Sequence, residues 1–362
     1  MVTIPTKTLN SGYTIPVLGL GTWLSQAGEV GKAVEYAIKN GYRHIDCAYA
    51  YLNQKEVGEA LSRVFAEKIV QRDEMFITSK VWNTFHSYEL AKKCVDEILA
   101  DLSLDYLDLC LIHWPHGYEE GGDIFPKTED GKKMRYSDVD YLETWRALED
   151  CVATGKIRSL GVSNFNHKQI SRIIENCTIK PAMLQEANKV DVMFSNKEKI
   201  VGPNGIEGRP LEHMKSFRAH DNTAISSPNV ELHPYFQQRK LREFCLAQGI
   251  TVTAYSPLGN PSMPFRRKGD AVALEDAVVK QIAEKHGRTP AQVILRWEIM
   301  NGIVVIPKSV SEKRIIENSK LFDFSLSAEE MAQMDGLDRN WRILDLTSRD
   351  GDHPLFPFIE EY

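Results

Sequence analysis

Gly41 to Gly58 reads G-Y-R-H-I-D-C-A-Y-A-Y-L-N-Q-K-E-V-G. An apolar run centred on Ile45 has the pattern of a strand, and a helical pattern begins a few residues later. Asp46 stands at the end of the strand pattern, and Tyr51 follows in the loop. A strand that ends in ionisable side chains and leads into a helix is the repeating unit of an α/β barrel.

Two later strand patterns end in a similar way. M-F-I-T-S-K-V-W contains Lys80 near its end, and L-D-L-C-L-I-H-W-P contains His113. The carboxyl ends of parallel barrel strands meet at one face, where such enzymes assemble their chemistry. We therefore expect Asp46, Tyr51, Lys80 and His113 to lie together.

Eight strand patterns alternate with helical patterns along the chain. Strands are predicted at 19–23, 43–48, 75–81, 107–113, 158–163, 182–185, 250–255 and 303–307. Helices are predicted near 28–40, 55–68, 88–102, 139–154, 167–176, 237–248, 272–286, 290–300 and 311–320. This alternation predicts one closed (β/α)8 TIM barrel. An Asn-Ser-Gly turn within residues 6–18 predicts an N-terminal β-hairpin cap.

Smaller signals refine this prediction. The segment V-E-L-H-P at 230–234 also reads as a strand. Four predicted helices end at a glycine, where a C-cap needs positive φ. These glycines are Gly41, Gly155, Gly249 and Gly287. A doubly wound open sheet is the alternative, but its G-x-G-x-x-G fingerprint is absent because Leu24 replaces the third glycine after G-L-G-T-W.

The composition is that of a soluble globular enzyme. The chain has 362 residues, 43% hydrophobic and 26% charged, with a formal net charge of −6. This mildly acidic balance gives no reason to expect nucleic acid or a membrane surface as a partner. No apolar run approaches the roughly 20 residues of a membrane span. The first ten residues lack the signal-peptide pattern, so we expect a cytosolic protein. Six scattered cysteines without a C-x-x-C pair predict reduced thiols and no metal site.

The four ionisable residues suit the reduction of a carbonyl group. A tyrosine with its ordinary pKa of about 10 is a poor proton donor at neutral pH. A neighbouring ammonium, which Lys80 can supply, favours the phenolate and lowers that pKa. Asp46 can hold Lys80 in place, and His113 can donate a hydrogen bond to a substrate carbonyl oxygen. Taken singly, each residue is commonplace, and Tyr51 could be a packed loop aromatic or Asp46 a structural carboxylate.

The order of these four residues at successive strand ends resembles the aldo-keto reductase family, in particular its aldose and aldehyde reductases. The resemblance extends over nearly the whole chain. It implies that Asp46, Tyr51, Lys80 and His113 form a catalytic tetrad. It further implies a monomer that reduces small aldehydes and ketones with NADPH. One departure is Gln54, where the family signature usually has glutamate.

The segment from Ile306 to Asn318, I-P-K-S-V-S-E-K-R-I-I-E-N, suits a phosphate monoester, because Lys308, Ser309 and Arg314 surround a strand end and a helix start. A solvated basic face is the alternative. The resemblance implies that this segment grips the 2′-phosphate of NADPH. The full set of cofactor residues that it implies is Thr22, Trp23, Ser163, Asn164, Gln185, Tyr255, Ser256, Leu258, Lys308, Ser309, Val310, Arg314, Glu317 and Asn318.

Within that set, the resemblance gives distinct roles to three groups. Ser163, Asn164 and Gln185 match residues that bind the nicotinamide carboxamide. Tyr255 matches the ring that stacks on the nicotinamide. Ser256 and Leu258 match contacts to the pyrophosphate.

The resemblance also implies an apolar substrate pocket, because several aromatic side chains after strand ends match, or nearly match, family positions that line one. It comprises Trp23, Ala50, Trp82, Trp114, Phe125, Phe265, Leu344, Leu346 and Arg349. Packing in the core is the alternative for the aromatic residues. The C-terminal tail matches the family's variable specificity loop. Its ending R-D-G-D-H-P-L-F-P-F resembles the aldehyde reductase branch, in which an arginine meets acidic substrates, a role that Arg349 would take here.

Residues 186–229 interrupt this pattern. In the family, the strand that ends in the counterpart of Gln185 runs directly into V-E-L-H-P. Here a polar segment without sustained periodicity separates them, which predicts a disordered insert in an otherwise single barrel domain spanning residues 1–362. Two explanations remain open: an alternative transcript or gene-model artefact, or a lid or partner loop at the barrel mouth. A rival function is therefore a catalytically impaired barrel that binds NADPH or a protein partner.

Overall fold

The strands form one parallel sheet in which neighbours in the chain are neighbours in space. The computed structural model describes residues 3–185, 232–259, 270–342 and 346–358. The sheet order follows the chain, and every adjacent pair is parallel. Its strands are β3 (Leu20–Gly21), β4 (His44–Asp46), β5 (Phe76–Val81), β6 (Leu107–Ile112), β9 (Ile157–Ser163), β10 (Met183–Gln185), β11 (Thr251–Ala254) and β12 (Val304–Val305).

The first and last strands meet and close the sheet into a barrel. Leu18 bridges Val305 and Gly21 bridges Lys308, both in parallel orientation. The Gly21 amide also donates a 3.3 Å hydrogen bond to the carbonyl of Pro307. A Cβ atom on Gly21 would lie 2.7 Å from the Ile306 carbonyl oxygen, so this closure requires glycine. The predicted (β/α)8 fold is confirmed.

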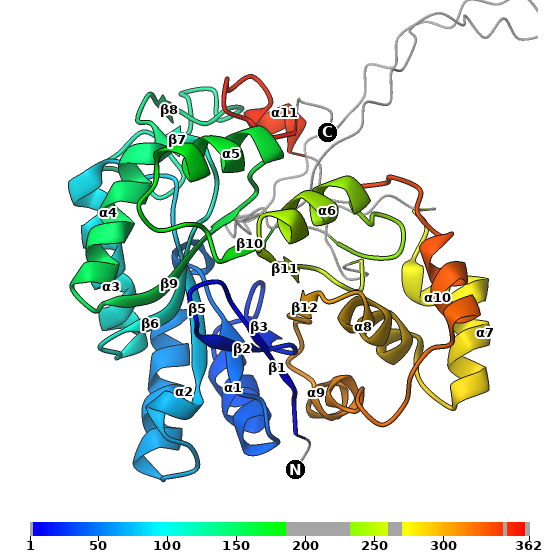
Figure 1. Ribbon diagram of the computed structural model, residues 1–362. Coiled ribbons are helices and arrows are strands. Elements are labelled where there is room, and N and C mark those ends of the chain that lie inside the picture. The colour runs from blue at the N-terminus through cyan, green and yellow to red at the C-terminus, as the bar shows by residue number, and fades with distance from the viewer. Residues whose placement is uncertain (1–2, 186–231, 260–269, 343–345, 359–362) are drawn as a thin grey trace, which may run out of the picture. The chain divides into compact units, whose positions relative to one another are not determined.

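Helices follow the strands and surround them (Figure 1). Consecutive helices pack against each other from α1 to α5, and α9 contacts both α8 and α1, which continues the ring past the closure. The helices are α1 (Val30–Lys39), α2 (Gln54–Ala66), α3 (Tyr88–Leu102), α4 (Tyr141–Ala153), α5 (His167–Asn176), α6 (Arg239–Ala247), α7 (Ala277–His286), α8 (Pro290–Met300), α9 (Glu312–Ser319) and α10 (Ala328–Asp335).

Apolar residues at helical spacing line the inward faces of the helices, and their burial holds the helices against the sheet. In α2, Val57, Leu61 and Val64 are fully buried, three to four residues apart. On the same helix a Cβ atom at Gly58 would lie 2.3 Å from the carbonyl oxygen of Asp101. Glycine therefore permits α2 and α3 to approach closely.

A hairpin closes the amino end of the barrel. β1 (Thr6–Thr8) and β2 (Thr14–Pro16) pair in antiparallel register, and Gly12 in their turn has a φ of 88°. Leu9 and Ile15 pack into an apolar cluster with buried side chains of the barrel strands. The predicted hairpin cap is confirmed, and the chemistry must lie at the other end.

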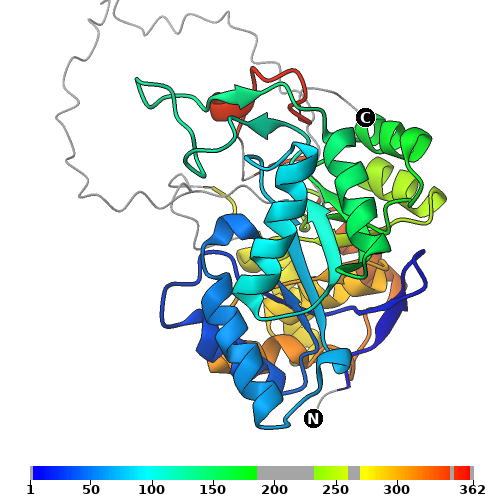
Figure 2. The same cartoon turned by 90° about the vertical axis from the view of Figure 1, so that its left-hand side faces the viewer.

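Two small elements and the C-terminal tail lie at that other end. β7 (Gly117–Tyr118) pairs with β8 (Tyr136–Ser137), and α11 (Thr347–Asp350) lies beside them. In Figure 2 the short green strands and the red helix lie beyond the carboxyl ends of the barrel strands. Gln169 donates to the carbonyl of Leu355, which ties the tail to α5. This segment corresponds to the predicted specificity loop.

Two predicted elements differ from the structure. In the described part of V-E-L-H-P, His233 forms an isolated bridge with Phe236 rather than a strand, since Pro234 cannot donate to a ladder and the chain turns. The predicted helix 272–286 is divided into a 3-10 turn, η3 (Ala273–Glu275), and α7, because Asp276 accepts from the amide of Val278 and caps a new helix.

The predicted glycine positions agree with the structure, and some other predictions lie beyond the described ranges. All four glycines predicted at helix ends have positive φ. The six cysteines are free, five of them buried. Among the described helices none is long and apolar enough to cross a membrane. The insert predicted at 186–229, with Phe265 and Leu344, lies outside the described residues, so those predictions stay untested.

Candidate active site

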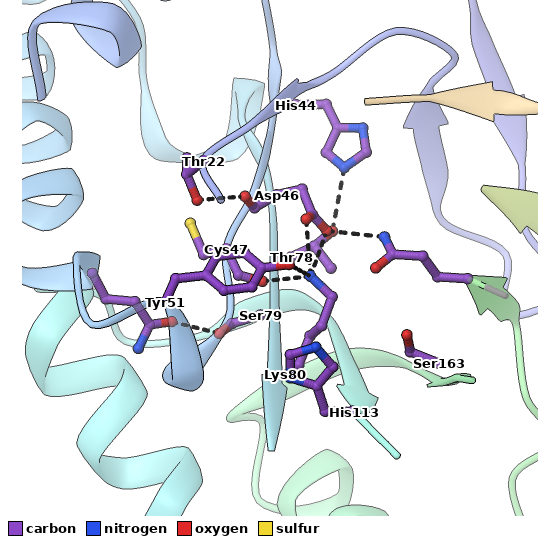
Figure 3. A network of polar contacts seen from close by, with 12 residues as sticks. Thr22, His44, Asp46, Cys47, Tyr51, Thr78, Ser79, Lys80, His113 and Ser163 are labelled. Atoms are coloured by element: carbon purple, nitrogen blue, oxygen red, sulfur yellow. Dashed lines mark hydrogen bonds and ion pairs between the residues drawn. The ribbon is translucent and has the colours of Figure 1, made fainter. Parts of the chain in front are cut away.

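Three of the four predicted tetrad side chains meet in one hydrogen-bonded group (Figure 3). Asp46 ends β4 and Lys80 lies near the end of the adjacent β5. The Nζ atom of Lys80 lies 3.0 and 2.9 Å from the two carboxylate oxygens of Asp46. It also lies 3.2 Å from the hydroxyl of Tyr51. The sequence order thus places a phenol, a cation and an anion in direct contact.

This ion pair is fully removed from water, and its geometry compensates for that burial. Lys80 is 0% exposed and Asp46 is 1% exposed. Two unit charges can be buried stably where further hydrogen bonds satisfy their remaining donors and acceptors. Lys80 also donates to the carbonyl of Cys47 at 2.7 Å, and Asp46 accepts from Nε2 of Gln185 at 3.1 Å. The ammonium is therefore held in one orientation, with the Tyr51 hydroxyl among its contacts.

Two ionisable groups next to the pair are kept neutral by burial. Burial lowers the pKa of His44 to about 4, and its Nε2 lies 3.3 Å from the hydroxyl of Thr78. Burial also raises the pKa of the Cys47 thiol to about 12. Neither side chain adds a charge to the site at neutral pH. Of these four groups, Lys80 and Asp46 are therefore the ones that supply charge next to Tyr51.

The loop that carries Tyr51 is fixed on both sides. Tyr51 ends a 3-10 turn, η1 (Tyr49–Tyr51), and Leu52 after it has a φ of 55°, which is uncommon for a residue other than glycine. Asn53 donates to the carbonyl of Thr22 at 2.9 Å. The hydroxyl of Thr22 in turn donates to the carbonyl of Asp46 at 2.8 Å. The strained turn is therefore tied to the strand end beside it.

His113 lies next to this group, at the end of β6. Its ring is 0% exposed, and its centroid lies 6.0 Å from that of Tyr51 in an edge-on arrangement. Trp82 also packs against the His113 ring, with centroids 5.1 Å apart. Asn164 donates to the carbonyl of His113 at 2.8 Å. The structure therefore brings all four predicted catalytic residues together.

Most of the predicted pocket residues share one apolar cluster beside the tetrad. Ala50, Trp82, Trp114 and Leu346 are buried in it, and Phe125 packs against it. Among the described pocket aromatics, Trp23 lies in a separate cluster, edge-on to Tyr255 with centroids 5.4 Å apart. The two clusters both adjoin the tetrad, because Tyr51 packs against the Trp23 cluster and Trp82 against His113.

Arg349 lies in α11 and is engaged by neighbouring side chains. Its Nη2 lies 2.5 Å from a carboxylate oxygen of Asp350 and 2.9 Å from the hydroxyl of Tyr118. Asp350 also accepts from Tyr118 at 2.9 Å and lies 3.6 Å from Nε2 of His116. The predicted contact between Arg349 and an acidic substrate stays a prediction, and it would compete with this ion pair.

The residues predicted for the nicotinamide carboxamide form a buried polar group. Ser163, Asn164 and Gln185 are 0%, 0% and 2% exposed. Within the described residues, Oδ1 of Asn164 and Oε1 of Gln185 receive no hydrogen bond. A buried acceptor without a donor is costly, so these two oxygens fit a ligand that brings N–H donors. A primary carboxamide supplies such donors, and the nicotinamide of NADPH therefore fits here.

The residues predicted for the rest of the cofactor lie in the two segments that follow β11 and β12. Ser256 has a φ of 48° and its carbonyl accepts from Gly259 at 2.8 Å, forming a tight turn. Ser309 is buried, and its hydroxyl accepts a 3.1 Å hydrogen bond from the amide of Ser311. Burial lowers the pKa of Lys308. Lys308 and Arg314 place two cations near the start of α9. Leu258, Val310, Glu317 and Asn318 lie in the same two segments.

Three curated relatives match the chain almost from end to end. The sequence model described as the aldo/keto reductase family matches residues 17–201 and 200–339. Aldo-keto reductase family 1 member A1 of Rattus norvegicus and that of Homo sapiens are each 42% identical over 98% of both chains. The Gallus gallus protein of the same name is 40% identical over 98% of this chain and 97% of its own. The chain belongs to the aldo/keto reductase family.

Solved structures agree with this membership. The aldose reductase of Schistosoma japonicum superimposes with a TM-score of 0.81 at 40% identity, covering 99% of this chain and 100% of its own. An aldo-keto reductase of Bombyx mori in complex with NADP gives 0.79 at 32% identity over the same shares. As a member of the family, the chain is an oxidoreductase that reduces carbonyl groups with NADPH. The rival function, an inactive binding barrel, is not favoured.

Several contributors to the site were not predicted from the sequence. The carbonyl of Cys47, which accepts from Lys80, is a backbone atom and leaves no signal in the residue type. Gln54, noted only as a departure, is 2% exposed and accepts a hydrogen bond from Ser79. A polar residue at the first position of α2, directly after the tyrosine loop, is the sequence signal that could have indicated this contact.

Proposed function

We propose that Tyr51 is the proton donor in the reduction of a small aldehyde or ketone. The observation that carries this proposal is the 3.2 Å contact between the Tyr51 hydroxyl and the buried Lys80 ammonium. When bound, NADPH supplies the hydride that adds to the carbonyl carbon. Tyr51 gives its proton to the carbonyl oxygen as negative charge develops there.

Lys80, Asp46 and His113 act on that proton transfer. Lys80 stabilises the phenolate that remains on Tyr51, because its charge cannot be screened by water in this buried position. Asp46 orients Lys80 through two hydrogen bonds. His113 donates a hydrogen bond to the carbonyl oxygen and so orients the substrate toward Tyr51.

The surroundings support a cofactor on one side and an apolar substrate on the other. Asn164 and Gln185 hold the nicotinamide carboxamide through their free oxygens. Lys308 and Arg314 hold the 2′-phosphate. Ala50, Trp82 and Phe125 form an apolar wall that favours aromatic or aliphatic aldehydes. We further propose that the protein acts in the cytosol as a monomer, in keeping with its composition.

Tyr51→Phe tests the central role, and Tyr49→Phe is its matched control in the same 3-10 turn. The Tyr49 hydroxyl donates to Glu97, away from Lys80. With NADPH and an aromatic aldehyde, we expect Tyr51→Phe to lower kcat at least about 100-fold. NADPH affinity, followed by quenching of tryptophan fluorescence, should change little. Tyr49→Phe should retain nearly full activity. A Tyr51→Phe enzyme as active as the control would disprove the assignment.

A further inference from the structure

A cavity with charged walls lies at the end of the barrel opposite the tetrad. Its volume is about 270 Å³. Ile250 and Ile303, which directly precede β11 and β12, form part of its wall, as does the hairpin residue Lys7. The tetrad lies at the carboxyl ends of the strands, whereas these residues mark the amino ends. The cavity is therefore separate from the site of reduction.

Two partly buried cations line this cavity, and both are held by neutral acceptors. Lys7 donates to the carbonyl of Gly302 at 2.8 Å. Arg242, on α6, donates to Oδ1 of Asn301 at 2.9 Å. Neither cation forms an ion pair with a carboxylate in the described ranges. Burial lowers the pKa of both side chains, and at Arg242 the nearby Asp335, Glu298 and Glu243 oppose this shift.

A third cation lies at the rim, together with two carboxylates. Arg239 is exposed and donates to Oε1 of Gln237 at 3.2 Å. Glu243 and Asp335 also line the cavity, so its cations outnumber its carboxylates by one. Oδ1 of Asp335 accepts a 2.8 Å hydrogen bond from the indole of Trp297. The two carboxylates therefore offset the three cations only in part.

The carboxyl group of Glu298 does not supply the missing charge. Its side chain is 0% exposed, and neither oxygen receives a hydrogen bond from the described residues. Burial raises the pKa of Glu298 well above its ordinary value, although Arg242 opposes this shift. The neutral form of Glu298 is thus favoured, and Arg242 keeps an excess of positive charge on the cavity side.

We propose that this cavity binds a small phosphate-bearing anion, at a site distinct from the cofactor site. Two guanidinium groups and one ammonium carry more N–H donors than their neutral partners use. Phosphate oxygens accept such charge-assisted hydrogen bonds well, and guanidinium can do so in a bidentate manner. Leu246, 78% exposed at the rim, and Val252 offer an apolar wall for the remainder of the ligand.

Calorimetric titration of inorganic phosphate into the NADP⁺-saturated protein tests this proposal. NADP⁺ occupies the cofactor's own phosphate site, and constant ionic strength removes general salt effects. We expect one saturable site. Arg242→Met and Lys7→Met should each weaken it at least about tenfold. Lys240→Met removes the same charge from α6 at a position outside the cavity lining, and should leave the affinity unchanged.

Two results would overturn the proposal: no saturable phosphate binding to the wild-type protein, or binding that is equally tight in both cavity variants. Lys7 lies on the hairpin and makes a single side-chain hydrogen bond. Lys7→Met is therefore decisive if Arg242→Met does not fold. Loss of binding in Lys240→Met to the same extent as in the cavity variants would also count against the site.

Discussion

The hydroxyl of Ser79 donates a 2.5 Å hydrogen bond to Oε1 of Gln54, and both side chains are buried. Ser79 directly precedes Lys80 on β5, and Gln54 follows Tyr51 by three residues at the start of α2. The bond thus links the segment that carries the proposed proton donor to the strand that carries the ammonium. We therefore expect it to help set the distance between Tyr51 and Lys80.

Replacing Gln54 tests that positioning effect. Gln54→Leu removes the acceptor and leaves the Ser79 hydroxyl buried, so we expect a loss of about 1–3 kcal/mol in the free energy of unfolding. Because Tyr51 would shift relative to Lys80, kcat should fall about tenfold or more, with the KM for NADPH nearly unchanged. Gln54→Glu keeps an oxygen at the same position and should retain more activity. A Gln54→Leu enzyme with reduced stability but normal kcat would show that the bond is purely structural.

Glu298→Gln tests the cost of a buried carboxyl. The pKa of Glu298 is raised in the native state, while the unfolded chain ionises at the ordinary value of about 4.5. Above that pH the unfolded state loses its proton first, so the native state loses stability as pH rises toward the native pKa. Glutamine cannot ionise, and we expect Glu298→Gln to be about 1–3 kcal/mol more stable at pH 7. Urea unfolding at pH 5, 7 and 8.5 should show a difference from wild type that grows with pH. A constant difference would contradict this account.

His353 makes the C-terminal tail sensitive to acid. Burial, and then the neighbouring His116, lower the pKa of His353 to about 4. Its Nδ1 accepts a 3.0 Å hydrogen bond from the amide of Leu355, which protonation would break. Asp350 and Asp138 oppose the shift, but the native pKa stays below the ordinary value of about 6.5. Stability is therefore lost as pH falls from about 6.5 to about 4.

The expected consequence is faster hydrogen exchange in residues 346–358 at pH 4.5 than at pH 7, after correction for intrinsic rates. His353→Asn keeps an acceptor for the Leu355 amide and does not titrate in this range. Its loss of stability between these pH values should be smaller than that of the wild type by about 1 kcal/mol. Equal acid sensitivity of the two proteins would assign the effect to other groups.

Arg349→Ala tests the specificity predicted for the tail. If the guanidinium meets a substrate carboxylate, kcat/KM for a carboxylated aldehyde should fall relative to a neutral one of similar size. Since Arg349 is already paired with Asp350, we expect a modest change of about fivefold. Arg135→Ala, at an exposed ion pair with Glu119, is the matched control. An unchanged substrate ratio would remove Arg349 from the pocket.

The tetrad could be predicted from the sequence because strand ends impose its geometry. Asp46 and Lys80 lie on adjacent parallel strands, whose carboxyl ends lie side by side at one edge of the sheet. The strained positions that follow strands or turns around the site, such as Asn164 and Ser256 with positive φ, could not be read from residue type. At Asn164 the conformation is tied to a partner distant in sequence, because its side chain donates to the carbonyl of His113.

Short elements were not predicted either, because they too depend on contacts that are distant in sequence. β7 and α11 are too short for a periodic pattern, and contacts such as that of Tyr118 with Asp350 hold them. The break at Asp276 was readable, because an aspartate before A-V-V is a helix N-cap signal. Pro234 in V-E-L-H-P likewise argued against a strand. In both places the prediction followed the apolar pattern, although Asp276 and Pro234 were local signals against it.

The bridge between Gly21 and Lys308 has a consequence for the synthesis of the protein. The residues proposed to hold the adenosine phosphate follow the last strand, and Thr22 beside the tetrad directly follows the first. A nascent chain still attached to the ribosome lacks one side of this nucleotide cradle until β12 has emerged. NADPH can therefore stabilise the finished barrel but cannot guide its early folding, and truncation before residue 308 should leave a chain that the cofactor does not rescue.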